Sequence, residues 1–213
     1  ITIRMLSTIN AVVPLINWLT NLKYLQMSVF RKVDLVSIPN VFSQTMWWPS
    51  MKIIDFDIVF LSYDEPNADI HYADLCNKVP WAQRVHGVKG SDAAHKAAAE
   101  RSETDWLVTV DADNIVYPSF FDLDIDFKDP DVQVYSWCGR NKINGLRYGN
   151  GGLKLWHKDF ILNMKTHEES DSERAQVDFC WEDGYCAFTK TFSDSVINGS
   201  AFQAWRAGFR EGV

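Results

Sequence analysis

Apolar and β-branched runs alternate with helix-forming segments along most of the chain. Four short runs predict strands, because each ends in a polar or turn-forming segment; they lie at 32–39, 57–63, 83–88 and 105–110. Between the last two runs, Ser91 and a series of alanines predict a helix over 91–102 with a face of small residues. Strands that alternate with helices are typical of an α/β fold, so we predict a mostly parallel sheet flanked by helices.

The second half of the chain shows a different pattern. Two further strands are predicted at 132–137 and 152–156, on either side of a glycine-rich link that contains Gly145, Gly149, Gly151 and Gly152. Helical segments are predicted near 158–165 and 200–210. The glycine-rich link follows no strand–helix phosphate-loop spacing, so it is either a hairpin or a loop that brings its backbone close to a ligand.

These patterns divide the chain into three parts. We predict an N-terminal helical appendage at 1–31, a single α/β domain at 32–190 and a C-terminal helical segment at 191–213. The sequence begins with Ile1 and stops in a polar run, so both ends look cut, and we expect a larger parent chain or assembly. The apolar segment 9–19 is too short to span a membrane and lacks a signal-peptide cleavage site, so no membrane partner is expected.

Composition narrows the class of protein. The 213 residues are 46% hydrophobic and 14% aromatic, which excludes disorder as the main state. The net charge of −7 disfavours a broad nucleic-acid-binding face, because phosphate contacts need clustered Lys and Arg. The four cysteines form no CxxC pair and no histidine has zinc-finger spacing, so we expect reduced thiols and a cytoplasmic location.

The sharpest chemical signal is a pair of aspartates at the end of the fourth predicted strand. Asp111 and Asp113 flank one alanine directly after the buried run 105–110. Carboxylates at the carboxyl end of a parallel strand can bind a hard divalent cation, whose coordination is often completed by substrate phosphates. The sequence therefore predicts a Mn²⁺ or Mg²⁺ site that neutralises a diphosphate leaving group.

The order of these features resembles the nucleotide-binding half of the GT-A glycosyltransferases, in the family-2-like group. The resemblance covers about 32–190 and is carried by an acidic turn after a strand, a small-residue helix and a strand that ends in DxD, at 57–64, 91–102 and 106–113. A closer similarity, to glycosyltransferase-like proteins of tailed bacteriophages, is carried by the segments 60–67, 84–90, 144–154, 198–200 and 204–211. If the protein is viral, as this similarity implies, its expected location is the cytoplasm of the host cell.

The resemblance implies a Rossmann-like GT-A domain that transfers a sugar from a nucleotide-sugar, commonly a UDP-sugar, with Mn²⁺ or Mg²⁺ at the DxD pair. The predicted donor-binding residues lie at the strand ends and on the small-residue helix: Pro39, Ser62, Tyr63, Asp64, His95, Lys96 and Asp111. His95 and Lys96 are included because a cation at the start of that helix can contact a diphosphate. The family often takes a third metal ligand from the later half, so His157 joins Asp111 and Asp113, with His167 as the other candidate.

The acceptor side is predicted from a second acidic signal. Inverting members of the group carry a Glu-Asp pair that deprotonates the acceptor hydroxyl, and Glu182 and Asp183 match it, with Asp183 preferred as the base. Trp181 would form a stacking wall for a sugar ring. The predicted acceptor or sugar pocket therefore consists of Trp181 and the glycine-rich residues Asn150, Gly151 and Gly152.

Two other functions are compatible with the sequence. A non-catalytic GT-A-like module that binds a glycan or docks in an assembly is favoured by the cut ends and by Ala-His-Lys at 94–96, where the family has Ala-Arg-Asn. A nucleotidyltransferase shares a similar sheet and metal site, but it usually needs a glycine-rich basic loop after the first strand, which 39–43 is not. The expected acceptor is a glycan or a modified base. DNA is less favoured as a partner than a glycan.

Overall fold

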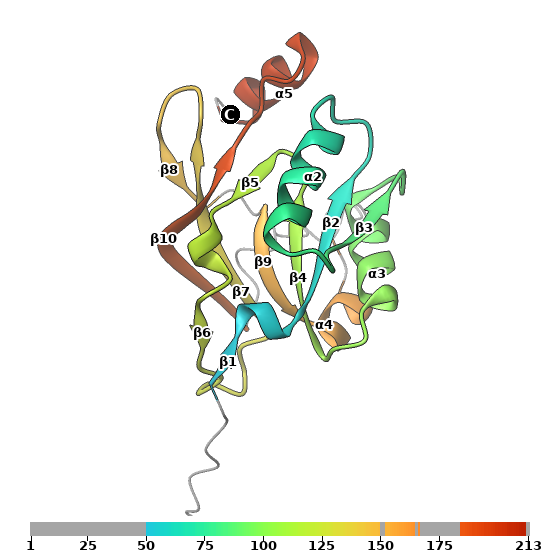
Figure 1. Cartoon of the computed structure of the whole chain (residues 1–213), viewed down its shortest axis with the longest axis vertical. Coiled ribbons are helices and arrows are strands. Elements are labelled where there is room, and N and C mark those ends of the chain that lie inside the picture. The colour runs from blue at the N-terminus through green and yellow to red at the C-terminus, as the bar shows by residue number, and fades with distance from the viewer. Residues whose placement is uncertain (1–49, 150–151, 165, 167–183, 212–213) are drawn as a thin grey trace, which may run out of the picture. The chain divides into compact units, whose positions relative to one another are not determined.

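The computed structural model describes residues 50–149, 152–164, 166 and 184–211 (Figure 1). Within them lies an eight-stranded sheet of order β3-β2-β4-β9-β7-β10-β5, with β8 paired to β7. The strands are β2 (Asp57–Ser62), β3 (Gln83–His86), β4 (Trp106–Asp111), β5 (Asn114–Val116), β7 (Val134–Asn141), β8 (Arg147–Tyr148), β9 (Leu153–His157) and β10 (Tyr185–Ser195). A separate two-stranded ribbon joins β1 (Met51–Lys52) to β6 (Asp124–Ile125).

The helices are α2 (Ala68–Lys78), α3 (Ser91–Arg101), α4 (Lys158–Asn163) and α5 (Ala201–Glu211), with short 3₁₀ turns η1 (Ile53–Asp55) and η2 (Pro118–Phe120). The predicted helix at 91–102 and the helical segments near 158–165 and 200–210 are confirmed by α3, α4 and α5. No helix among the described residues is long and apolar enough to cross a membrane.

The predicted α/β class is confirmed. β2 is parallel to both β3 and β4, and this half of the sheet contains three of the four strands predicted in the first part of the chain. The fourth, at 32–39, lies outside the described residues, as does the boundary predicted at residue 31. Because β2 and β4 are hydrogen-bonded directly, β2 is the parallel neighbour of the strand that carries Asp111.

The other half makes the sheet mixed. β9 is antiparallel to β4 and β7, β10 is parallel to β7, and β5 is antiparallel to β10. Five of the eight strands therefore run in one direction (β2, β3, β4, β7 and β10) and three run in the other. β10 continues through Ser195, so it crosses the boundary predicted between 190 and 191 and occupies the beginning of the predicted C-terminal helical segment.

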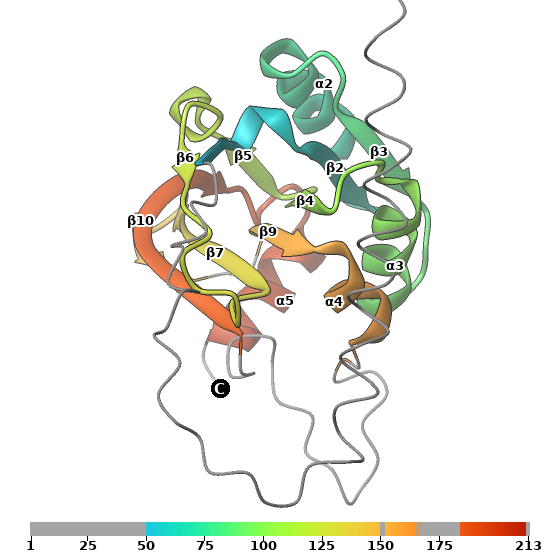
Figure 2. The ribbon, with the colours of Figure 1, turned by 90° about the horizontal axis from the view of Figure 1, so that it is seen from below.

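Alternation along the central strands builds a core on each face of the sheet. Val59 and Leu107 point to the face covered by α3 and α4, where they pack with Ala98. Ile58 and Val108 point to the opposite face and pack with Leu75 of α2. Both faces of these strands are buried, which explains why they appear in the sequence as continuous apolar runs. Figure 2 shows α2 and α3 on opposite sides of β2 and β4.

Asp57 anchors the start of β2, at the amino-terminal edge of the parallel strands. One of its carboxylate oxygens, Oδ2, accepts hydrogen bonds from the Ser102 hydroxyl over 2.9 Å and from the backbone N–H groups of Glu103 and Thr104 over 2.6 and 3.1 Å. Burial by itself raises the pKa of Asp57, but these hydrogen bonds outweigh it and hold the pKa below its usual value. The charged carboxylate therefore stabilises the fold.

We expect Asp57→Asn to lower the free energy of unfolding at pH 7 by about 1–3 kcal/mol, because charge-assisted hydrogen bonds are lost. The stabilisation from a carboxylate of lowered pKa is present above the unfolded pKa, about 3.9, and is lost as the pH falls through the lower folded value. Urea unfolding of both proteins between pH 3 and pH 7 measures it. A stability difference that stays constant down to pH 3 would contradict this account.

Candidate functional site

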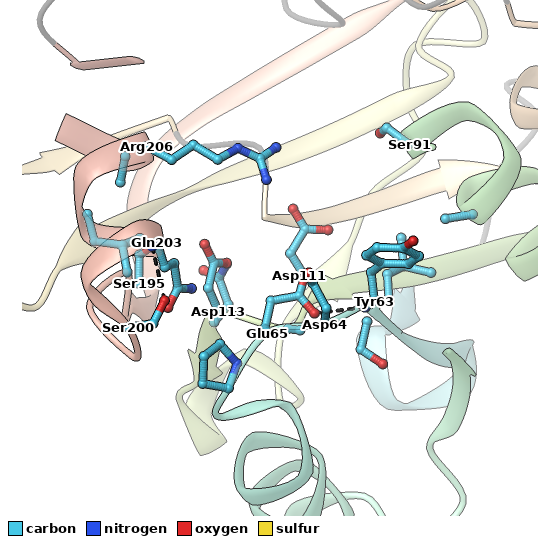
Figure 3. Close-up of a pocket in the computed structure, with 18 of the residues that line it drawn as sticks. Tyr63, Asp64, Glu65, Ser91, Asp111, Asp113, Ser195, Ser200, Gln203 and Arg206 are labelled. Carbon is cyan, nitrogen blue, oxygen red and sulfur yellow. Dashed lines mark hydrogen bonds between the residues drawn. The ribbon is translucent and has the colours of Figure 1, made fainter. Parts of the chain in front are cut away.

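A cavity of about 860 Å³ opens at the carboxyl edge of β2 and β4. It is lined by the turn after β2, the loop between β3 and α3, the turn between β4 and β5, and helix α5 (Figure 3). Its ionisable lining residues include Asp64, Glu65, Asp111, Asp113, Lys89, His95 and Arg206. Strand ends of a parallel sheet are where α/β folds place their ligands, so this cavity is the candidate functional site.

The aspartate turn, residues 111–114 between β4 and β5, has its backbone held by hydrogen bonds from two other parts of the structure. The N–H of Asp111 donates to the carbonyl of Gly152 over 2.9 Å, which joins the end of β4 to the start of β9. The buried side chain of His71, on α2, donates from Nδ1 to the carbonyl of Ala112 over 2.7 Å. The turn is therefore fixed from the sheet and from one covering helix.

The second aspartate, Asp113, is hydrogen-bonded to the chain that follows β10. The carbonyl of Asp113 accepts from the N–H of Val196 over 2.7 Å, just beyond β10. Its carboxylate accepts from Nδ2 of Asn114 over 2.7 Å. Figure 3 shows the side chains of Asp111 and Asp113 projecting into the same space. The structure thus brings the two predicted metal ligands together.

The acidic turn after β2 lines the same space. Tyr63 is 46% exposed, Asp64 is exposed, and Glu65 accepts from the N–H of Tyr63 over 2.8 Å. Ser62 is buried at the strand end, where its hydroxyl hydrogen-bonds to Nδ1 of His86 over 2.9 Å. The predicted donor residues Ser62, Tyr63 and Asp64 therefore lie beside Asp111, around one cavity.

Helix α3 begins at the cavity. Gly90 is its N-cap and has a φ of 99°, a conformation that favours glycine, and Ser91 opens the helix. His95 lines the cavity, but it is buried, donates from Nδ1 to the carbonyl of Ser91 over 2.8 Å and contacts the ring of Trp156 edge-on. The predicted donor residue Lys96 forms an ion pair with Asp92 over 2.7 Å and is not part of the cavity lining.

The sequence interpretation missed the contribution of α5. Ser200, Gln203 and Arg206 line the side of the cavity opposite Tyr63 and Ser91. The Ser200 hydroxyl accepts from the N–H of Gln203 over 3.1 Å, which caps the start of the helix. The guanidinium of Arg206 extends over the aspartates in Figure 3. The motifs at 198–200 and 204–211 were the signal for this face, although they indicated no role for it.

One predicted metal ligand is not at the site. His157 ends β9, which runs antiparallel to β4, and its register partner is Trp106 at the beginning of β4. Five residues of strand, roughly 16 Å, separate that position from Asp111. His157 therefore lies at the opposite edge of the sheet, which corrects the predicted metal set. The other predicted candidates Pro39, Asn150, Gly151, His167, Trp181, Glu182 and Asp183 lie outside the described residues.

Asp111 and Asp113 suit a hard divalent cation, because both supply carboxylate oxygens to one cavity. Within the described parts of the chain, no group of three or more His, Cys, Asp or Glu side chains is arranged to hold a metal ion. The candidate metal ligands among the described residues are therefore two carboxylates. Mg²⁺ is bound in this way when water and substrate phosphates complete its coordination.

No protein-family model matches the sequence, and no curated protein matches it. Several solved structures have partial similarity to the chain. A197 from STIV has a TM-score of 0.42 and 12% identity, over 62% of this chain and 82% of that chain. The glycosyltransferase GlyE of Streptococcus pneumoniae TIGR4 has a TM-score of 0.39 and 14% identity, over 62% and 45%. The inositol-1-phosphate CTP transferase from T. maritima has a TM-score of 0.38 and 12% identity, over 73% and 77%.

TM-scores below 0.5 at these identities establish neither a family nor an activity for this chain. Its own topology defines an α/β, Rossmann-like protein with a mixed sheet flanked by helices. Its site is an acidic cavity at the strand ends, with Lys89 and the exposed Arg206 on the wall. Such a cavity can hold a divalent cation together with a phosphate-bearing ligand.

Proposed function

We propose that this chain is a metal-dependent glycosyltransferase that takes a sugar from a nucleotide-sugar, with a UDP-sugar as the expected donor. The observation that carries the proposal is the position of Asp111 and Asp113, at the end of β4, in a cavity that Arg206 also lines. A cation on the aspartates and an arginine nearby are suited to the two negative charges of a diphosphate.

The diphosphate, the nucleobase and the ribose of the donor each have a chemically suitable wall in the cavity. The diphosphate would contact Arg206, Lys89 and the N–H groups at the start of α3, whose helix dipole favours an anion. The half-exposed ring of Tyr63 offers a face to the nucleobase, and Asp64 offers acceptors to ribose hydroxyls. When bound at Asp111 and Asp113, Mn²⁺ or Mg²⁺ would neutralise the charge that develops on the leaving diphosphate.

The remaining chemistry needs a base for the acceptor. In an inverting reaction the acceptor oxygen bonds to the anomeric carbon, the bond from that carbon to the diphosphate breaks, and the hydroxyl proton passes to a carboxylate. Asp183, with Glu182 as the alternative, is our proposed base, on the sequence pattern alone. Trp181, Asn150, Gly151 and Gly152 stay the proposed acceptor pocket on the same ground.

A glycan suits the acceptor side better than DNA. The cavity contains Asp64, Glu65, Asp111 and Asp113, and this charge repels a polyanion. Phe202 lines the cavity and is 69% exposed, so an aromatic face is available to the apolar side of a sugar ring. A neutral saccharide can approach such a wall without an electrostatic cost.

We expect UDP-sugars to raise the melting temperature of the protein only when Mn²⁺ or Mg²⁺ is present. Binding to the folded state alone adds about 2.7 kcal/mol of stability at a ligand concentration of 100 times Kd. A thermal-shift screen of nucleotide-sugars and nucleoside triphosphates, with and without Mn²⁺, measures this. Mass spectrometry of the stabilising mixtures identifies the product.

The outcomes separate the three candidate functions. Release of UDP from a UDP-sugar supports glycosyl transfer. Release of pyrophosphate from a nucleoside triphosphate would instead favour a nucleotidyltransferase. If millimolar nucleotides give no stabilisation with either metal, the chain is better described as a non-catalytic module, and the proposal is wrong.

A further inference from the structure

Two buried polar residues behind Asp113 form a chain of hydrogen bonds that ends on its carboxylate. Asn114 Nδ2 donates to Asp113 Oδ1 over 2.7 Å, and the hydroxyl of Ser193 donates to Asn114 Oδ1 over 2.8 Å. Asn114 is 2% exposed and Ser193 is fully buried. The chain joins β10 to the aspartate turn across 79 positions of sequence.

The carboxylate of Asp113 selects the orientation of the Asn114 amide, and the hydroxyl of Ser193, which can donate or accept, donates to the amide oxygen in that orientation. An amide has an acceptor side and a donor side. With its oxygen on Ser193, its N–H₂ group faces Asp113. The reversed amide would place its oxygen against a carboxylate oxygen, which is repulsive. The geometry therefore fixes a donor at Oδ1 of Asp113.

The backbone just before β9 keeps Asn114 in this position. A Cβ atom added to Gly152 would lie 2.1 Å from Nδ2 of Asn114 and 2.8 Å from its Cγ. No side chain fits between them, so the amide packs directly on the backbone of Gly152. Gly152 also accepts from the N–H of Asp111 over 2.9 Å. Gly152 therefore contacts the backbone of Asp111 directly and packs on the amide that donates to the carboxylate of Asp113.

We infer that Asn114, hydrogen-bonded to Ser193, is a positioning residue that holds the carboxylate of Asp113 for cation binding. This inference rests on the metal site in the proposed function. Residues that hydrogen-bond to metal ligands orient them, and their removal typically weakens metal binding 10- to 100-fold. A purely structural role would instead change the stability of the protein without changing its affinity for the cation.

The test compares three variants by titration of Mn²⁺, with free Mn²⁺ followed by electron paramagnetic resonance, in the presence and absence of UDP. Asn114→Leu removes both hydrogen bonds at similar size, and Ser193→Ala removes only the outer one. Ser102→Ala is the matched control: it removes a buried serine hydroxyl that donates to Asp57 over 2.9 Å, at the opposite edge of the sheet. Thermal melting in the absence of metal reports the stability of each protein.

We expect Asn114→Leu to raise the Kd for Mn²⁺ about 10- to 100-fold and Ser193→Ala to raise it less. Ser102→Ala should lower the melting temperature and leave the Kd unchanged. If Asn114→Leu is too unstable to measure, the comparison of Ser193→Ala with Ser102→Ala decides the question. Wild-type affinity in Asn114→Leu and Ser193→Ala would overturn this inference alone. Failure of the wild-type protein to bind Mn²⁺ with UDP would overturn the metal site and this inference together.

Discussion

Asp111→Asn and Asp113→Asn are each expected to reduce metal-dependent sugar transfer, or hydrolysis of the nucleotide-sugar, by at least roughly 100-fold. Removing one group that stabilises developing charge in a transition state commonly costs a factor of 10² to 10³. Both carboxylates line the cavity, and within the described residues no third acidic or histidine ligand is arranged to replace either of them. The loss should be accompanied by weaker Mn²⁺ binding.

The matched control lies just before the same strand. Asp105 is an exposed aspartate immediately before β4, at the edge of the sheet opposite Asp111. Asp105→Asn removes the same charge from the protein, and its activity should stay at the wild-type level. Initial rates of UDP release at several Mn²⁺ concentrations provide the comparison. Full activity in both Asp111→Asn and Asp113→Asn would remove the basis of the metal role.

Arg206→Ala is expected to have the next largest effect, a loss of about 10- to 1,000-fold in kcat/KM for the donor. Its guanidinium lines the cavity wall and, unlike the ammonium group of Lys89, can donate two hydrogen bonds in one plane to a phosphate. Arg206→Lys keeps the charge but loses the planar donor pair, so it should recover only part of the activity. Because Arg206 is exposed, we expect both variants to keep the fold.

The substrate dependence of the Arg206 variants tests the assignment further. If Arg206 binds the diphosphate, affinity for UDP should fall and affinity for uridine should change little, because uridine has no phosphate. Calorimetry with the two ligands measures the contrast. Equal weakening for both, or for neither, would argue against a phosphate contact. Melting curves of Arg206→Ala and Arg206→Lys check that the fold is retained.

The part of the site that was predictable is local in sequence. The runs at 57–63 and 105–110 identified β2 and β4, because strands buried on both faces are continuously apolar. The end of β4 then placed Asp111 and Asp113 at the edge where parallel strands carry ligands. The acidic turn after β2 followed from the same rule.

The sequence pattern did not predict the direction in which each strand runs. An apolar run such as Leu153–His157 predicts a strand, but it does not say which neighbour the strand takes or in which direction it runs. Because β9 is antiparallel to β4, its start lies beside Asp111 and its end lies beside Trp106. This single fact brings Gly152 to the site and removes His157 from it.

The sequence by itself determined the α/β class of the described domain, the strand that carries the aspartate pair and the acidic turn next to it, because these depend on residues a few positions apart. Only the tertiary structure decided that α5 brings Arg206 to the cavity and that Ser193 hydrogen-bonds to Asn114 beside Asp113. Those contacts join segments about 80 or more positions apart, and they arise from sheet order and register, which local periodicity does not specify.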